Sequence, residues 1–371
     1  MFNNVDMHSS AIHDTRRASL ARRIGDAGLD AIIVSDLVNV RYLTGFTGSN
    51  GAVLVHAGPD RDGDRIATDG RYTTQVAEQA PGLTALIERD CPPALIRATG
   101  SGTVAVEGHV ITVDAYRRLA DLAETTGVTL TTATDEVEAL RIAKDDGEVE
   151  FITSACRIGD AALAALVGRG AIAAGRTERQ VARDLEWEMF ALGAESIAFE
   201  TIVAAGASSA VPHHRPTDAV LAVGDLVKID FGAVSGGYHS DMTRTFVLGE
   251  PAAWQSEIHA IVLTAQRAGR EALEVGADLA GIDSAARDVI AEAGYGDYYV
   301  HGLGHGVGLR IHEAPGIGAA ASGTLPDGAT VTVEPGIYLP GRGGVRIEDT
   351  LVVTDAGPTS LTTTSRALRV L

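Results

Sequence analysis

Alternating apolar and polar positions predict short strands and helices in the first 140 or so residues. Apolar runs bounded by Gly, Asp or Asn predict strands at 31–36, 39–46, 51–55, 65–69, 103–108 and 128–134. Positions with helical spacing predict helices between them, near 15–28, 72–79 and 113–124. Because the two kinds of element alternate, we expect an α/β domain with a mixed sheet covered by helices.

The rest of the chain repeats one pattern, two helices followed by a pair of strands. Helices are predicted at about 148–170 and from Thr177, whose Gln180 completes a capping box, and again near 253–275 and 282–293. Each helix pair precedes a strand, a glycine-rich turn and a return strand, at 227–247 and 330–353. A charged stretch at 141–150 marks the expected boundary, which gives domains of 1–142 and 143–371.

The composition is that of a globular protein with sizeable cores, since 45% of the 371 residues are apolar. The net charge of −19 argues against nucleic-acid or anionic-membrane partners. Cys91 and Cys156 are too few and too far apart for a disulfide framework. The first residues include acids where a secretory signal would be apolar, and no apolar run approaches about 18 residues. We therefore expect a cytoplasmic protein.

Paired acids in the two strand pairs are the main chemical feature. The first pair holds Asp230 and Asp241, the second holds Glu334 and Glu348, and a glycine-flanked histidine, His305, lies between the pairs. Four carboxylates facing one another would repel strongly unless cations neutralised them. Two divalent metal ions would supply that charge. Oxygen ligands with one imidazole favour Mn²⁺, with Co²⁺, Fe²⁺ and Zn²⁺ as alternatives.

These segments resemble the pita-bread metallopeptidases, which include aminopeptidase P, prolidase and methionine aminopeptidase. The resemblance runs from about residue 148 to the end and is carried by VKIDFG, SDMTRTF, HGLGHGVGL, VTVEPGIY and GVRIEDT. It implies a pita-bread α+β domain with a dinuclear metal centre. Asp230 would bind one ion, His305 and Glu334 the other, and Asp241 and Glu348 would bridge them.

The first domain is similar to the N-terminal domain of bacterial aminopeptidase P-like proteins, which is also the creatinase N-terminal type. The similarity is carried by NVRYLTGFTGSNG and TDGRYTTQ. It implies a domain that walls the active site and builds a homodimer or a higher homo-oligomer.

The same resemblance implies roles for residues around the metals. His213, in AVPHHRPTD, and His312 are the expected catalytic histidines, and Glu334 is expected to transfer a proton. His301 is expected to bind substrate. Arg346 alternates onto the same strand face as Glu348, so it should lie beside the metals and orient a carboxylate or the substrate.

The expected activity is removal of the residue that precedes proline in peptides. The sequence favours an Xaa-Pro aminopeptidase, with an Xaa-Pro dipeptidase (prolidase) as the alternative. A dipeptidase needs a cation for the carboxylate after proline, and Arg346 and Arg310 are the candidates. A metal-free creatinase-like hydrolase and an inactive binding module are disfavoured because all five ligands are present. His214 has no expected role.

Overall fold

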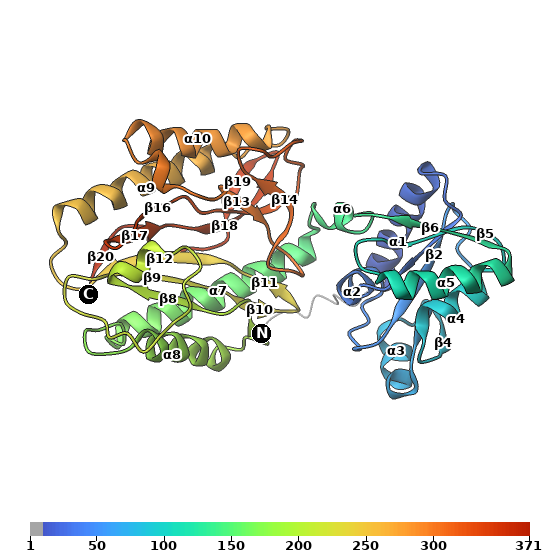
Figure 1. The fold of residues 1–371 in the computed structure, drawn as a ribbon. Helices are drawn as coiled ribbons and strands as arrows, with labels where there is room; N and C mark the ends of the chain where they lie inside the picture. The colour runs from blue at the N-terminus through green and yellow to red at the C-terminus, as the bar shows by residue number, and fades with distance from the viewer. Residues whose placement is uncertain (1–9) are drawn as a thin grey trace. The chain divides into compact units, whose positions relative to one another are not determined.

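The computed structural model describes residues 10–371, and the chain divides into two compact units, Met1–Arg141 and Ile142–Leu371 (Figure 1). Each unit has its own sheets and its own core of buried apolar side chains. The predicted fold class is confirmed, with a mixed α/β unit first and an α+β unit after it.

The first unit is built on one six-stranded sheet with the order β4-β3-β2-β1-β5-β6. β1 pairs antiparallel with β2, and β2 with β3, whereas the other neighbours are parallel, so the sheet is mixed as expected. The strands are β1 (Ala31–Val34), β2 (Ala52–His56), β3 (Arg65–Thr68), β4 (Thr84–Ile87), β5 (Gly102–Glu107) and β6 (Val128–Ala133).

Helices cover both faces of this sheet. Ile33, Leu54 and Val104 pack in one core cluster with residues of α4 (Cys91–Thr99) and α5 (Val113–Thr126). α1 (Ser10–Asp26) and α2 (Leu37–Thr44) contact β2 and each other. The shorter helical segments are η1 (Gly70–Tyr72), α3 (Thr73–Gln79) and α6 (Glu138–Arg141).

The strand predicted at 39–46 is wrong, because this segment lies in helix α2 and the turn after it. Asp36 caps the helix by accepting hydrogen bonds from the backbone N–H groups of Val38 and Asn39. Gly45 ends it in the left-handed conformation, with φ 78°. The apolar positions Val40 and Leu43 are therefore buried with helical spacing rather than strand alternation.

The second unit has the two predicted helix pairs. They are α7 (Asp146–Gly168) with α8 (Glu178–Ala191), and α9 (Ala253–Glu271) with α10 (Leu279–Glu292). The predicted capping box is present at the start of α8, where the side chain of Thr177 accepts from the backbone of Gln180 and the Gln180 side chain accepts from Thr177.

Among the helices of the described residues, α7 alone has the length and apolar composition of a membrane span. Just over half of its apolar window, 56%, is buried inside the unit. Core helices pass the same test, so this finding is weak evidence for a membrane segment.

The sheets of the second unit lie between the helix pairs, with α9 and α10 on one side and α7 and α8 on the other (Figure 1). The two larger sheets have the orders β20-β12-β9-β8 and β14-β13-β15-β18-β19, and the two smaller ones have the orders β11-β10-β7 and β16-β17. The strands of the two larger sheets are β8 (Ile202–Ala205), β9 (Leu226–Phe231), β12 (Met242–Val247), β20 (Arg369–Val370), β13 (Gly304–Gly306), β14 (Glu313–Ile317), β15 (Thr330–Val333), β18 (Asp349–Thr354) and β19 (Gly357–Ser360).

Each predicted strand pair is in fact two short hairpins in line. β9 pairs with β12, and between them β10 (Ala233–Ser235) pairs with β11 (Tyr238–His239) and β7 (Ser196–Ile197). Likewise β15 pairs with β18, and between them β16 (Gly336–Leu339) pairs with β17 (Gly343–Arg346). Three of the four predicted acidic ligands lie at the breaks between inner and outer hairpins, and Asp230 lies one residue before the end of β9.

Candidate metal centre and active site

The five predicted metal ligands converge between the two strand pairs. One ligand atom from each of Asp241, His305 and Glu348 lies within 4.8 Å of the others. The Nε2 atom of His305 is 3.4 Å from Glu334 Oε1 and 3.6 Å from Asp241 Oδ2. Asp230 lines the same cavity as these four residues. Residues more than 100 positions apart in the sequence therefore form one site.

Strand alternation directs the carboxylates into the space between the sheets. Val227 and Ile229 of β9 pack in the core with α7 and α8, so Asp230 faces the opposite way. Val331 and Val333 of β15 pack with α9 and α10, which leaves Glu334 on the inner side. The outward apolar residues thus fix the direction of the inward acids.

Backbone contacts join the second acids of the two strand pairs. The backbone N–H of Glu348 donates to the carbonyl of Thr243 over 3.1 Å. The hydroxyl of Thr350 donates to the carbonyl of Asp241 over 2.8 Å. These bonds hold Asp241 and Glu348 against each other across the internal repeat.

The glycines beside His305 are required by close packing of strands. A Cβ atom on Gly304 would lie 2.0 Å from the carbonyl oxygen of Thr332, and one on Gly306 would lie 2.2 Å from that of Ala314. Neither backbone oxygen has room to move, because β13 lies between β14 and β15. Only glycine therefore permits the strand that carries His305 at this place.

The hydrogen bonding of His305 leaves one ring nitrogen free to bind a cation. Its Nδ1 atom is 3.0 Å from the carbonyl oxygen of Gly306, so Nδ1 carries the hydrogen. Burial lowers the pKa of His305 to about 4, and the ring is neutral near pH 7. The lone pair of Nε2 then faces the carboxylates of Asp241 and Glu334, which is repulsive without a cation between them.

The electrostatics of the acids also fit bound cations. Burial raises the pKa values of Asp241 and Glu348 well above their usual range, and the neighbouring carboxylates raise them further. Burial likewise raises the pKa of Glu334 to about 7. Asp230 Oδ1 is buried with no hydrogen-bond partner among the described residues. The residues present therefore fit divalent metal ions, which would neutralise the acids and satisfy that oxygen.

Arg346 holds two of the acidic ligands from behind. Its guanidinium is buried and contacts Asp230 Oδ2. Its Nε donates to the hydroxyl of Thr243, which in turn donates to Glu348 Oε2 over 2.6 Å. The predicted place of Arg346 beside the metal ligands agrees with this geometry, and the carboxylates it orients are those of the protein.

A cavity of about 240 Å³ opens onto the five acidic and imidazole ligands. The predicted catalytic residues His213 and His312 both line it. The ring of His312 meets the ring of His305 edge to face, with centroids 4.4 Å apart. Burial lowers the pKa of His312, and His213 contributes in the same direction. The other lining residues are Phe199, Glu200, Ile202, His214, Arg215 and Ile311.

The two predicted substrate-binding residues do not line this cavity. His301 Nε2 lies 2.8 Å from the hydroxyl of Tyr338, which also accepts from Arg346 Nη1 over 2.9 Å. Tyr338 lies in β16, four residues after Glu334, and was not singled out from the sequence. The substrate-binding roles of His301 and Arg346 stay predictions.

His214 and Arg215 line the cavity, although no role was predicted for them. His214 Nε2 lies 2.8 Å from Glu178, so it ties the loop to α8. Arg215 pairs with Glu200 at 2.9 Å. Arg310, a candidate reader of a substrate carboxylate, is exposed and is not part of the lining.

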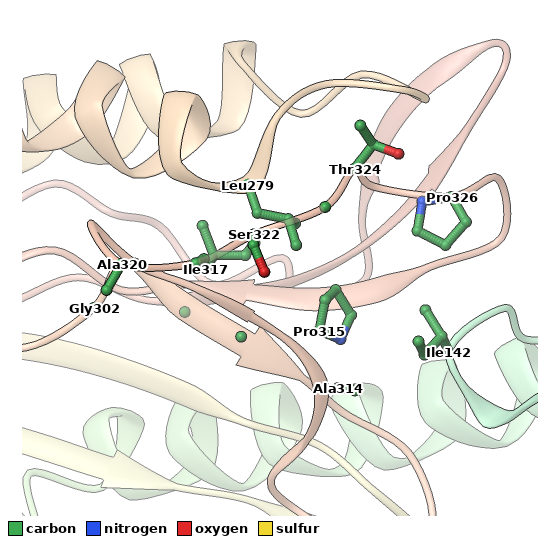
Figure 2. A pocket seen from close by; sticks show the side chains of 15 residues that line it. Ile142, Leu279, Gly302, Ala314, Pro315, Ile317, Ala320, Ser322, Thr324 and Pro326 are labelled. Atoms are coloured by element: carbon green, nitrogen blue, oxygen red, sulfur yellow. The ribbon is translucent and has the colours of Figure 1, made fainter. Parts of the chain in front are cut away.

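A larger cavity, of about 790 Å³, lies elsewhere in the second unit (Figure 2). Leu279, Pro315, Ile317 and Pro326 contribute much of its wall, and its lining has no acidic, basic or imidazole side chain. Its polar side chains are the hydroxyl groups of Ser322 and Thr324, and no general base or metal ligand lines it beside them, so the smaller cavity is the candidate active site.

Two known families match the chain. Residues 150–355 match the family described as Metallopeptidase family M24. Residues 16–143 match the Creatinase/Prolidase N-terminal domain. Together the two matches cover the sheets of the first unit and all five candidate ligands.

Relatives align over almost their whole length. The Xaa-Pro dipeptidase of Pyrococcus furiosus is 38% identical, with 95% of this chain and 99% of that protein aligned. The structure of an Xaa-Pro dipeptidase from Bacillus anthracis superposes with a TM-score of 0.89 at 35% identity, covering 97% of this chain and all of that one. The X-Pro aminopeptidase of Thermotoga maritima gives 0.84 at 35% identity, covering 94% and 98%. The chain belongs to metallopeptidase family M24, the pita-bread peptidases, and is a peptide hydrolase with a creatinase/prolidase N-terminal domain.

Proposed function

We propose that the chain is an Xaa-Pro dipeptidase that works with two divalent metal ions. The observation that carries this proposal is that the candidate ligands and the histidines around one cavity of about 240 Å³ lie in a chain that aligns over its length with proteins named Xaa-Pro dipeptidases. The Pyrococcus and Bacillus relatives are named Xaa-Pro dipeptidases. The main sequence-based prediction, an aminopeptidase, is not confirmed, and its dipeptidase alternative has better support.

The proposed ligand roles are those of the family resemblance. Asp230 would hold one ion, His305 and Glu334 would hold the other, and Asp241 and Glu348 would serve both. When bound, the ions would balance the buried negative charge, polarise the scissile carbonyl and lower the pKa of a water molecule. The donor set favours Mn²⁺, with Co²⁺, Fe²⁺ and Zn²⁺ as alternatives, and the identity of the metal stays a prediction.

The chain's own groups bind the peptide and move protons. His213 and His312 line the cavity, where an N–H group can donate to the carbonyl oxygen as it gains negative charge. Glu334 also lines the cavity, and we assign proton transfer to it: its carboxylate would take a proton from the attacking water and give it to the proline nitrogen. That nitrogen has no hydrogen in an Xaa-Pro bond, so it must receive a proton to leave as an amine.

Broader expectations from the sequence also stay predictions. They are a first domain of residues 1–142 that walls the active site and builds a homodimer, and a cytoplasmic location. Proline-containing peptides are the proposed partners, and no nucleic acid or membrane is proposed.

The substrate length tests the proposed function. With Mn²⁺ restored to the metal-free protein, an Xaa-Pro dipeptide is expected to have a kcat/KM at least tenfold above that of an Xaa-Pro-Xaa tripeptide, a difference of about 1.4 kcal/mol. Release of the first residue measures both rates. Equal or faster cleavage of the tripeptide would favour the aminopeptidase instead. Absence of cleavage with Mn²⁺, Co²⁺, Fe²⁺ and Zn²⁺ would contradict both activities.

The bridging ligands should be indispensable. Asp241→Ala and Glu348→Ala are each expected to abolish hydrolysis and to lower bound metal to one ion or none, because each carboxylate serves both ions. Metal analysis of the purified variants measures this, with exposed Glu274→Ala as the control. Two tightly bound ions and full activity in either variant would refute the dinuclear assignment.

The role proposed for His312 separates catalysis from metal binding. His312→Ala is expected to lower kcat by roughly 10²-fold or more, as for loss of a donor to the transition state. Bound metal should stay at the wild-type level. Loss of metal would instead make His312 a ligand.

Buried acids should make the metal-free protein less stable at high pH. The pKa of Glu334 is about 7 in the folded chain against an ordinary 4.5, so the folded state binds a proton that the unfolded state releases. This stabilisation is complete below about pH 4.5 and is lost as the pH rises through about 7. Glu334→Gln is therefore expected to raise Tm at pH 8 and not at pH 4.5, by roughly 2–4 °C per kcal/mol.

Scanning calorimetry of the metal-free variants measures this effect. Glu274→Gln, at an exposed position, serves as the control and should leave Tm unchanged at both pH values. A larger effect of Glu334→Gln at pH 4.5 than at pH 8 would show that the sign is wrong.

A further inference from the structure

We propose that Arg215 binds the free carboxylate that follows proline and thereby selects dipeptides. This inference rests on the proposed function, because it needs a peptide bound at the metal centre. It assigns the specificity to a loop side chain, whereas strand alternation pointed to Arg346 or Arg310.

Arg215 is the one Lys or Arg among the described residues that line the active-site cavity. Four histidines also line it, but His305 is a proposed metal ligand, and no imidazole offers a carboxylate the pair of parallel N–H donors that a guanidinium does. A dipeptide brings its carboxylate within a few ångströms of the bond that is cut, because proline is the only residue between them. The carboxylate must therefore find its cation at the cavity.

The neighbouring cations are committed elsewhere. Arg346 is 2% exposed and donates to Asp230, to Thr243 and to Tyr338. Lys228 is fully buried, and its Nζ donates to the carbonyl oxygens of Val211 and Pro212. Moving either side chain toward a substrate would leave buried polar groups without partners.

The backbone around Arg215 is anchored on both sides. Before it, the Pro212 carbonyl accepts from both Lys228 and Arg346. After it, the backbone N–H and the hydroxyl of Thr217 donate to Glu178 Oε2 over 2.9 and 2.8 Å. The loop thus fixes where the Arg215 side chain begins, while the side chain itself is largely exposed.

A substrate carboxylate can replace Glu200 as the ion-pair partner of Arg215 at little cost. Its Nε lies 2.9 Å from Glu200 Oε2, and the two side chains are 83% and 59% exposed. Exposed ion pairs contribute little to stability, so replacing Glu200 by a substrate carboxylate loses little. A guanidinium can bind that carboxylate through two parallel hydrogen bonds. A longer peptide has an amide at this place and gains nothing from the exchange.

The experiment uses the full-length, Mn²⁺-loaded protein with Ala-Pro and with Ala-Pro amide, which differ only in the carboxylate. Arg215→Gln is expected to lower kcat/KM for Ala-Pro at least tenfold, mainly through KM, and to change that for the amide less than threefold. Arg215→Lys should recover part of the loss. Arg310→Gln, an exposed position outside the cavity, is the matched control and should leave the ratio of the two substrates unchanged.

The outcomes separate this inference from the proposed function. If the wild-type protein cleaves neither substrate, the proposed function fails. If it cleaves Ala-Pro and Arg215→Gln lowers both substrates equally, or neither, then Arg215 does not bind the carboxylate. An equal change of the ratio in Arg310→Gln would also overturn the assignment.

Discussion

Mutual repulsion among four inward-facing acids is the constraint on which the second unit depends. Asp230, Asp241, Glu334 and Glu348 share a small cavity with His305. Burial raises the pKa values of Asp241, Glu334 and Glu348 above their usual range. Packing must therefore hold like charges together when no cation is bound. The two apolar clusters do this, because each sheet buries its outward residues against its own helix pair. The internal repeat thus supplies two rigid walls that meet at the metal ligands.

Glu348 and Asp349 show how adjacent acids acquire different functions. Strand alternation turns them to opposite sides. Asp349 faces α9, where it accepts from Gln266, and it is paired with Arg244 and Arg366. Although burial alone would raise the pKa of Asp349, these two arginines hold it below its usual range. Glu348 has a hydroxyl as its hydrogen-bond partner, and its pKa is raised. Asp349, whose charge the two arginines balance, therefore has a structural role. Glu348, whose charge is not balanced in this way, remains a candidate metal ligand.

The sequence predicted which five residues come together in the second unit better than it predicted local structure in the first unit. The five candidate ligands could be named because each lies beside glycines or alternating apolar residues. These neighbours have a structural role that the sequence pattern indicates, such as the close strand packing at Gly304 and Gly306 beside His305. The segment 39–46 was misread because its apolar residues suit either period, and the cap at Asp36 decides for helix. Tyr338 was missed because its role depends on contacts with His301 and Arg346 that only the folded chain brings together.

The residue that selects substrate length is harder to predict from the sequence than the metal ligands are. The candidate metal ligands lie on strands or directly beside them, where alternation fixes the direction of a side chain. A side chain that binds the substrate carboxylate must instead have no buried partner to give up. Arg346 looked suitable by alternation, yet the fold uses its guanidinium to hold Asp230 and Thr243. If Arg346 turned toward a substrate carboxylate, the buried carboxylate that it now contacts would lose its ion pair. In the proposed assignment the substrate length is therefore selected by Arg215. Its backbone is anchored in the loop, and its exposed side chain has no partner in the core.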